Sequence, residues 1–287
     1  MSKLYRQVVV SIAVSVIILL STTITVYAWF TSNRIVYTDK VSCRSGTKMV
    51  DLYVSDTGGE DFPENKETNI VQLNKANKDK LMPVSTFDLK NFVYNDGTVE
   101  DMAVHFSKVS NEEYLYHGRV YLLAKAQGNN EKEKLALYLD NNSEKGLLFE
   151  KSTGYILNAV RLGLVFNEDE TRIIRISDEQ NYSAERKNNT VLNGELLSEN
   201  QVIDSSGEKL QAKTDPSVLI NKYMVDENGI ALEGTEPLLI MDLNNVYVVD
   251  IYVYLEGCDP DCVDVLQLNS MSFHLSFYGV LTNDTYE

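Results

Sequence analysis

The side chains most able to do chemistry in this sequence are three histidines, three cysteines and an acidic turn near the C-terminus. His105, His117 and His274 lie far apart, and none stands in the HExxH pattern with which a metalloprotease binds zinc. The sequence also lacks the GxSxG turn of serine hydrolases and the glycine-rich loop that holds nucleotide phosphates. We therefore predict a protein that is not an enzyme, with no catalytic residues and no cofactor.

An odd number of cysteines cannot be fully paired within one chain. Cys258 and Cys262 flank Asp259-Pro260-Asp261, and a bend at the proline would bring their α-carbons within about 7 Å, close enough for a disulfide. Cys43 stands alone, early in the sequence. We predict a Cys258–Cys262 disulfide, which export would permit. A bridge from Cys43 to one of the other two and three free thiols are the alternatives.

Four carboxylates, Glu256, Asp259, Asp261 and Asp264, fall within nine residues of the acidic turn. Oxygen ligands of this kind suit calcium. The segment lacks the ligand spacing and the glycine of an EF-hand loop, and carboxylate-rich turns of acidic proteins are usually solvated. The prediction is therefore a solvated turn without a bound metal.

The composition indicates a folded, anionic protein. Hydrophobic residues make up 44% of the 287 residues, and 15 Gly and 5 Pro are too few for a low-complexity or collagen-like chain. The 42 acidic side chains outnumber the 26 basic ones, which gives a formal net charge of -16. Because such a surface repels a phosphate backbone, we predict that nucleic acid is not a partner.

The first thirty residues predict export. Two basic side chains precede an apolar stretch, Val8–Leu20, and a more polar stretch follows it. Val26 and Ala28 then stand at the -3 and -1 subsites of a signal peptidase, so cleavage would leave Trp29 as the new N-terminus. Residues 8–30 would also make about 35 Å of helix, enough for an uncleaved membrane anchor. Both interpretations place the rest of the chain in the extracellular space or on the cell surface.

Alternation of apolar and polar residues with a period of two indicates that strands build the exported part. The clearest strands are 246–255 and 271–277, residues 50–55 also alternate, and two predicted hairpins pair 119–124 with 135–139 and 159–166 with 171–176. Many short strands predict an all-β fold, a two-sheet sandwich of jelly-roll type after an N-terminal hydrophobic helix. An α+β domain with a helix at 155–160 or 185–197 is the alternative.

No internal repeat divides the chain, so we predict two regions. Residues 1–28 are the signal peptide or membrane anchor, and residues 29–287 are one exported β-sandwich domain. The stretch 177–236 of this domain is polar and rich in Asn, Glu and Ser. It is predicted to be an insertion with short elements of its own.

Three short stretches carry a resemblance to a known family. They are Tyr27-Ala28-Trp29-Phe30-Thr31-Ser32-Asn33 at the export junction, Asn158–Leu164 in mid-chain, and the strand end that runs from Tyr252 into Gly257-Cys258-Asp259-Pro260-Asp261-Cys262. Together they resemble exported surface proteins of Gram-positive, clostridial-type bacteria, the TasA/camelysin type with a SipW-type signal peptide. The resemblance implies a jelly-roll subunit outside the cell, processed by a dedicated signal peptidase and assembled into fibres through exchange of an N-terminal strand.

An open sheet edge would accept such a strand, because the N–H and C=O groups along it lack partners. Cleavage after Ala28 would release the candidate donor, which is the extended segment Arg34, Ile35, Val36, Tyr37 and Thr38. The alternative is that residues 29–38 are the domain's own first strand or a stalk.

These features predict an exported, non-enzymatic structural or surface protein, such as a biofilm-matrix or fibre subunit that associates with itself. The alternative is a surface-tethered module that binds a polysaccharide or a host protein through Tyr247, Tyr252, Tyr254 and Tyr278, whose rings could stack on a ligand. Tyrosines at such positions also form the half-buried faces of sheets. A hydrolase without a recognisable motif is the third hypothesis.

Overall fold

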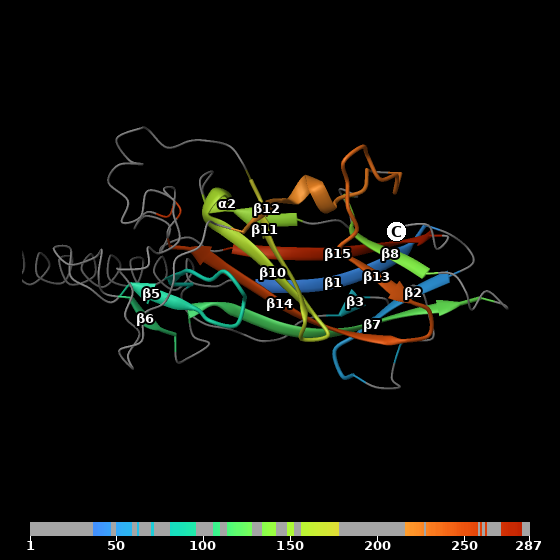
Figure 1. Cartoon of the computed structure of the whole chain (residues 1–287), viewed down its shortest axis with the longest axis horizontal. Helices are drawn as coiled ribbons and strands as arrows, with labels where there is room; N and C mark the ends of the chain where they lie inside the picture. The colour runs from blue at the N-terminus through green and yellow to red at the C-terminus, as the bar shows by residue number, and fades with distance from the viewer. Residues whose placement is uncertain are drawn as a thin grey trace, which may run out of the picture.

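The computed structural model describes residues 37–46, 50–58, 62, 70–71, 81–95, 106–109, 114–127, 134–141, 148–151, 156–177, 216–226, 228–257, 259, 262 and 271–282. These residues form two packed β-sheets with almost no helix (Figure 1), which confirms the predicted all-β, two-sheet sandwich. The predicted leader, residues 1–28, lies outside the described residues. Within the described part of the chain, no helix is long and apolar enough to cross a membrane.

Sheet A has the last strand of the chain at its centre. Its strands follow the order β13 (Leu239–Asp242), β8 (Lys134–Leu139), β15 (Met271–Thr282), β1 (Tyr37–Ser45) and β3 (Ile70–Val71). The short strand β9 (Leu148–Lys151) pairs with the beginning of β15, and β8 pairs with its end. In Figure 1, β1 in blue runs beside β15 in red.

Sheet B combines strands from early, middle and late parts of the chain. Its order is β12 (Val218–Leu219), β11 (Glu170–Arg175), β10 (Val160–Phe166), β14 (Val246–Glu256), β7 (Tyr116–Ala126) and β2 (Val50–Ser55), and β4 (Pro83–Val84) pairs with the end of β14. A separate two-stranded sheet consists of β5 (Val93–Asn95) and β6 (Phe106–Lys108). The two described helical turns are α2 (Ile156–Ala159) and η3 (Ile220–Tyr223).

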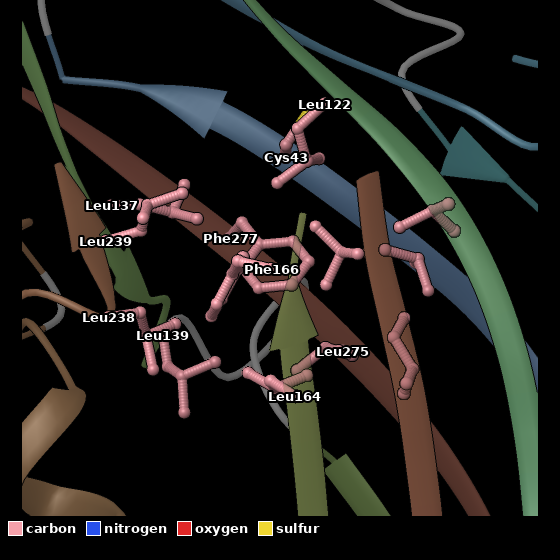
Figure 2. Close-up of a cluster of buried hydrophobic side chains, with 14 of the residues drawn as sticks. Cys43, Leu122, Leu137, Leu139, Leu164, Phe166, Leu238, Leu239, Leu275 and Phe277 are labelled. Atoms are coloured by element: carbon pink, nitrogen blue, oxygen red, sulfur yellow. The ribbon is translucent and has the colours of Figure 1, made fainter. Parts of the chain in front are cut away.

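The main core lies between the two sheets, because each sheet turns an apolar face inward. Leu275 and Phe277 of β15 belong to one cluster with Leu164 and Phe166 of β10 (Figure 2). The exposed fraction of these four residues is at most 1%. Burial of a side chain of this size contributes about 1.5–3 kcal/mol to folding, so the interleaved faces hold the sheets together.

Sheet B is also covered on its outer face. Leu89 and Phe92 pack there against a second buried group that includes Val165 and Tyr254. Gly163 permits this approach, since a β-carbon on it would lie 2.6 Å from Leu89 Cδ2. Leu89 itself has a positive φ of 56°, which is uncommon for leucine. As a result, every residue of β10 is buried, on both faces of the strand.

Most of the predicted strands are confirmed. The segments 50–55, 246–255 and 271–277 lie in β2, β14 and β15, and the hairpin of 159–166 with 171–176 is the antiparallel pair β10–β11. In the region of the alternative helix, residues 156–159 form α2 and Val160 already begins β10.

The predicted hairpin of 119–124 with 135–139 is wrong. Both segments are strands, but β7 pairs with β14 and β2 in sheet B, whereas β8 pairs with β15 and β13 in sheet A. The connection between them therefore crosses from one sheet to the other. Turn-forming residues such as Gly128-Asn129-Asn130 favour a change of direction, and they do not decide which strand becomes the partner.

The end of the predicted polar insertion 177–236 packs on the sandwich. β12 pairs in parallel with the end of β11, and η3 follows it directly. Tyr223 joins the main core, and Val225 packs on the outer face of sheet A with Tyr278. The alternative helix at 185–197 lies outside the described residues.

Candidate functional site

β1 is held in sheet A by the last strand of the chain. It pairs in parallel with β15 over eight residue pairs, with an irregularity between Thr38 and Lys40. Every other strand pair that the structure describes in sheet A is antiparallel. On the opposite side, β3 pairs with Val41 and Ser42 of β1. Tyr37 and Thr38 of the predicted donor segment thus begin a strand that pairs within its own chain.

One face of β1 contributes to the core. Val41 and Cys43 are buried in the cluster between the sheets. Figure 2 shows Cys43 in this cluster. Cys43 is a free thiol, and its Sγ donates a hydrogen bond to the carbonyl oxygen of Leu52 in sheet B at 3.2 Å. Burial raises the pKa of the Cys43 thiol well above its ordinary value, which makes it a structural, unreactive side chain.

The other face of β1 carries polar side chains that bond across the strands. Ser42 Oγ donates to Ser276 Oγ at 3.0 Å, and Ser276 Oγ lies 3.5 Å from Asp140 Oδ2, directly after β8. His274 Nε2 lies 3.0 Å from Ser42 Oγ. These contacts join β1 to β15 on the outer face of sheet A.

Arg44 links three strands of sheet A. Its guanidinium lies over the ring of Tyr278, 4.5 Å from the ring centroid, and forks onto the carboxylate of Asp140. The Nη2–Oδ1 distance is 2.7 Å. The Asp140 side chain is 0% exposed and that of Arg44 is 34% exposed. Hydrogen bonding to Asp140 raises the pKa of Arg44, although burial opposes the rise.

Gly46 ends this segment against the same tyrosine. Its main-chain N–H donates to the carbonyl oxygen of Gly279 at 2.9 Å. A β-carbon on Gly46 would lie 2.4 Å from Tyr278 Oη, so a larger residue there would require the Tyr278 side chain to shift. We call the whole polar arrangement the β1 seam; its members are Ser42, Arg44, Gly46, Asp140, His274, Ser276 and Tyr278.

Two of the stretches that carry the family resemblance meet in space. Arg161 of β10 lies opposite Tyr254 of β14, and its Nη2 atom contacts Asp259 Oδ2 at 2.7 Å. The Arg161 side chain is 2% exposed, and Nη1 also donates to the carbonyl oxygen of Asn158. The loop after β14 is therefore anchored to β10 by a buried ion pair.

The same loop bears on the predicted disulfide and on the acidic turn. Successive turns place Asp259 N 3.1 Å from Glu256 O and Cys262 N 2.9 Å from Asp259 O. Cys258 lies outside the described residues, so its bridge to Cys262 stays a prediction. Asp261 and Asp264 also lie outside them. No group of three or more potential metal-ligating side chains converges anywhere in the described ranges.

A second charged group lies on the outer face of sheet B. Arg119 of β7 forks onto Asp250 of β14 with two distances of 2.8 Å, and His117 Nε2 lies 2.9 Å from Asp250 Oδ1. The His117 ring stacks on Tyr252 with 4.5 Å between centroids. Burial raises the pKa of Asp250, but the bonds from His117 and Arg119 outweigh it and lower this pKa to about 2.

The four tyrosines of the alternative binding surface are dispersed. Tyr254 is 0% exposed beneath Phe92, and Tyr252 also contacts Phe92, with 5.6 Å between ring centroids. Tyr278 lies in the other sheet under Arg44, and the Tyr247 hydroxyl accepts a hydrogen bond from the main chain of Asp242. These four side chains do not form one exposed aromatic surface.

A small pocket lies beside β11 and η3. Its volume is about 240 Å³, and its lining includes Thr171, Arg172, Tyr223 and Glu236. The two charged residues are already paired, Arg172 with Glu170 at 3.1 Å and Glu236 with Lys222 at 3.0 Å. The pocket therefore offers no uncompensated charge to a ligand.

Several predicted site residues lie outside the described part of the chain, namely Val26, Ala28, Trp29, Arg34, Ile35, Val36 and Cys258. The sequence interpretation missed Ser42, Arg44 and Asp140. The first two could have been found, because they alternate with Val41 and Cys43 and so share the polar face of a strand. Asp140 carries no such signal, since a single acid after an apolar strand normally marks the solvated end of that strand.

The chain matches no known family model, no characterised protein and no solved structure.

Proposed function

We propose that the chain is an exported, non-enzymatic structural protein of a bacterial cell surface, a jelly-roll subunit that assembles into fibres by exchanging its N-terminal strand. The observation that carries the proposal is the parallel pairing of β1 with β15. β1 is the first and β15 the last of the described strands, and a strand near one end of a fold can be replaced by the same strand of a second copy.

The connectivity of β1 favours exchange. Among the described strands, β1 is followed by β2 in the opposite sheet, and four residues of sequence separate the two strands. Opening that connection would move β1 onto a neighbouring subunit, where it would meet the same side chains. The number of contacts made by β1 would then stay the same. The free-energy cost of exchange would be limited to opening the hinge and to bringing two subunits together.

The export step supplies the proposed trigger. Cleavage after Ala28 by a signal peptidase would leave eight residues before Tyr37 and so release the start of β1. A chain that keeps residues 8–30 as a membrane anchor would instead display the same domain on the surface. Self-association and the signal peptidase are the proposed partners.

A strand that is locked in place tests the proposal. Ser42 Oγ and Ser276 Oγ lie 3.0 Å apart, so Ser42→Cys with Ser276→Cys, in a Cys43→Ala background, can form a disulfide between β1 and its own β15. We expect the oxidised chain 29–287 to stay monomeric in negative-stain microscopy and size-exclusion chromatography. After reduction it should form filaments. The matched control, Ser276→Cys in the same background, should form filaments under both oxidising and reducing conditions.

Two outcomes would contradict the proposal. Filaments of equal yield from the oxidised double variant would show that assembly does not need β1 to leave its own sheet. The proposed fibre function would be wrong if the processed wild-type chain stays monomeric at every salt concentration, pH and protein concentration.

A further inference from the structure

Resting on the proposed function, we propose that Asp140 selects the strand that sheet A accepts, and that its partner is residues 42–46 of a second copy of this chain. The acceptor position is the space between β15 and β3 that β1 fills. The buried carboxylate at its rim admits a strand that brings a guanidinium over Tyr278 and rejects one that does not.

A buried charge is costly when it lacks a partner. The Asp140 side chain is 0% exposed, and the Arg44 guanidinium forms an ion pair with it. When a strand without this cation fills the acceptor position, Asp140 stays buried and loses that ion pair. Loss of one member of a buried pair is far more costly than loss of an exposed one, so the carboxylate discriminates between strands.

The pair also sets the register. A strand can slip by two residues and still turn its apolar side chains inward. In the observed register Ser42 lies opposite Ser276 and Arg44 opposite Tyr278. A slip of two would place either Ser42 or Gly46 opposite Tyr278, and neither residue can neutralise Asp140. One register is therefore strongly favoured over its neighbours.

The remaining positions restrict the incoming sequence further. A β-carbon at Gly46 would press on the end of the Tyr278 side chain, and Cys43 is buried in the core, so both positions favour small residues. Ser42 supplies the hydroxyl that bonds to His274 and Ser276. The acceptor position thus recognises the segment Ser42-Cys43-Arg44-Ser45-Gly46, which is the chain's own first strand.

A double-mutant cycle between a strand peptide and the chain tests this selection. The acceptors are the chain 29–287 with Arg44→Met, whose own β1 lacks the cation, and the same chain with Asp140→Met added. The probes are fluorescent peptides of residues 37–46 that carry either the native Arg44 or Arg44→Met. We expect the first acceptor to bind the native peptide about tenfold or more tightly than the substituted one in fluorescence anisotropy. In the second acceptor this preference should fall within about threefold.

The outcomes separate the two proposals. Equal binding of both peptides by the first acceptor would overturn the selectivity of Asp140 while strand exchange stands. Binding of neither peptide, with circular dichroism showing a folded sheet, would overturn exchange and selectivity together. Where Asp140→Met does not fold, Asp140→Asn removes the same charge at nearly constant volume and gives the second acceptor.

Discussion

Both sheets of the sandwich carry an arginine that forks onto a buried aspartate, with a histidine and a tyrosine beside it, but the two groups connect different kinds of strand. In sheet B, Arg119 and Asp250 are register partners on β7 and β14, which both have strands on either side. In sheet A, Arg44 extends from β1 across β15 to reach Asp140. The first pair joins adjacent strands of sheet B, whereas the second joins β1 to the end of a strand that is not its neighbour, across β15.

The two pairs also differ in burial. The exposed fraction of the aspartate side chain is 0% for Asp140 and 7% for Asp250, and that of the arginine is 34% for Arg44 and 46% for Arg119. The same chemistry therefore has a larger consequence at the β1 seam. Burial and position in the sheet, and not residue type alone, therefore set how much an ion pair contributes to holding a strand in place.

The largest expected effect comes from breaking the more buried pair. Arg44→Met leaves the Asp140 carboxylate buried without its guanidinium, and we expect the free energy of unfolding to fall by about 3 kcal/mol. Urea unfolding followed by circular dichroism measures this loss. Restoration of most of the stability by adding Asp140→Met would confirm the cause. A loss of less than about 1 kcal/mol would show that the Arg44–Asp140 pair contributes no more than an exposed ion pair, and would contradict the proposed difference between the two ion pairs.

The dependence of stability on acidic pH should report the contribution of the ion pair in sheet B. The pKa of Asp250 is lowered to about 2 from an ordinary 3.8, so its contribution is complete above pH 4 and is lost as the pH falls from 4 towards 2. We expect about 2 kcal/mol of stability to disappear over that range. In Asp250→Asn this part of the pH dependence should be absent, and an unchanged slope between wild type and variant would contradict the assignment.

The smallest effect is expected at the exposed arginine of sheet B. Arg119→Met should lower the free energy of unfolding by about 1 kcal/mol, because nearly half of that side chain is already in water. Filament yield should not change, since neither β7 nor β14 leaves the sheet during exchange. Ile230→Ser, at a residue that is 60% exposed, is the matched surface control. A loss of filaments in Arg119→Met, with the fold intact, would extend the assembly surface to sheet B.

Local patterning predicted much of the fold. Period-two alternation identified β2, β14 and β15, and the turn at residues 167–170 identified the β10–β11 hairpin. The same reasoning failed for β7 and β8, because alternation describes the two faces of a strand and not its neighbour. The complete burial of β10 was equally hidden, since it depends on Leu89, which approaches from more than seventy residues earlier in the chain.

The candidate site was less accessible to sequence reasoning than the fold. Arg44 and Asp140 are 96 residues apart, and each has the type and setting of a solvated surface charge. They become a pair only because β15, from the end of the chain, lies between their strands. The motifs that did attract notice, Asn158–Leu164 and the cysteine loop, meet through Arg161 and Asp259, for which no local pattern gave the distance.

The amino-acid sequence alone determined the strand character, the anionic composition and the polar and apolar faces of each strand, because these follow from the types of residues one or two positions apart. Only the tertiary structure decided which strands became neighbours, which carboxylate was enclosed and which arginine neutralised it. Those outcomes depend on contacts between distant segments, where burial turns an ordinary aspartate into a charge that must have a partner.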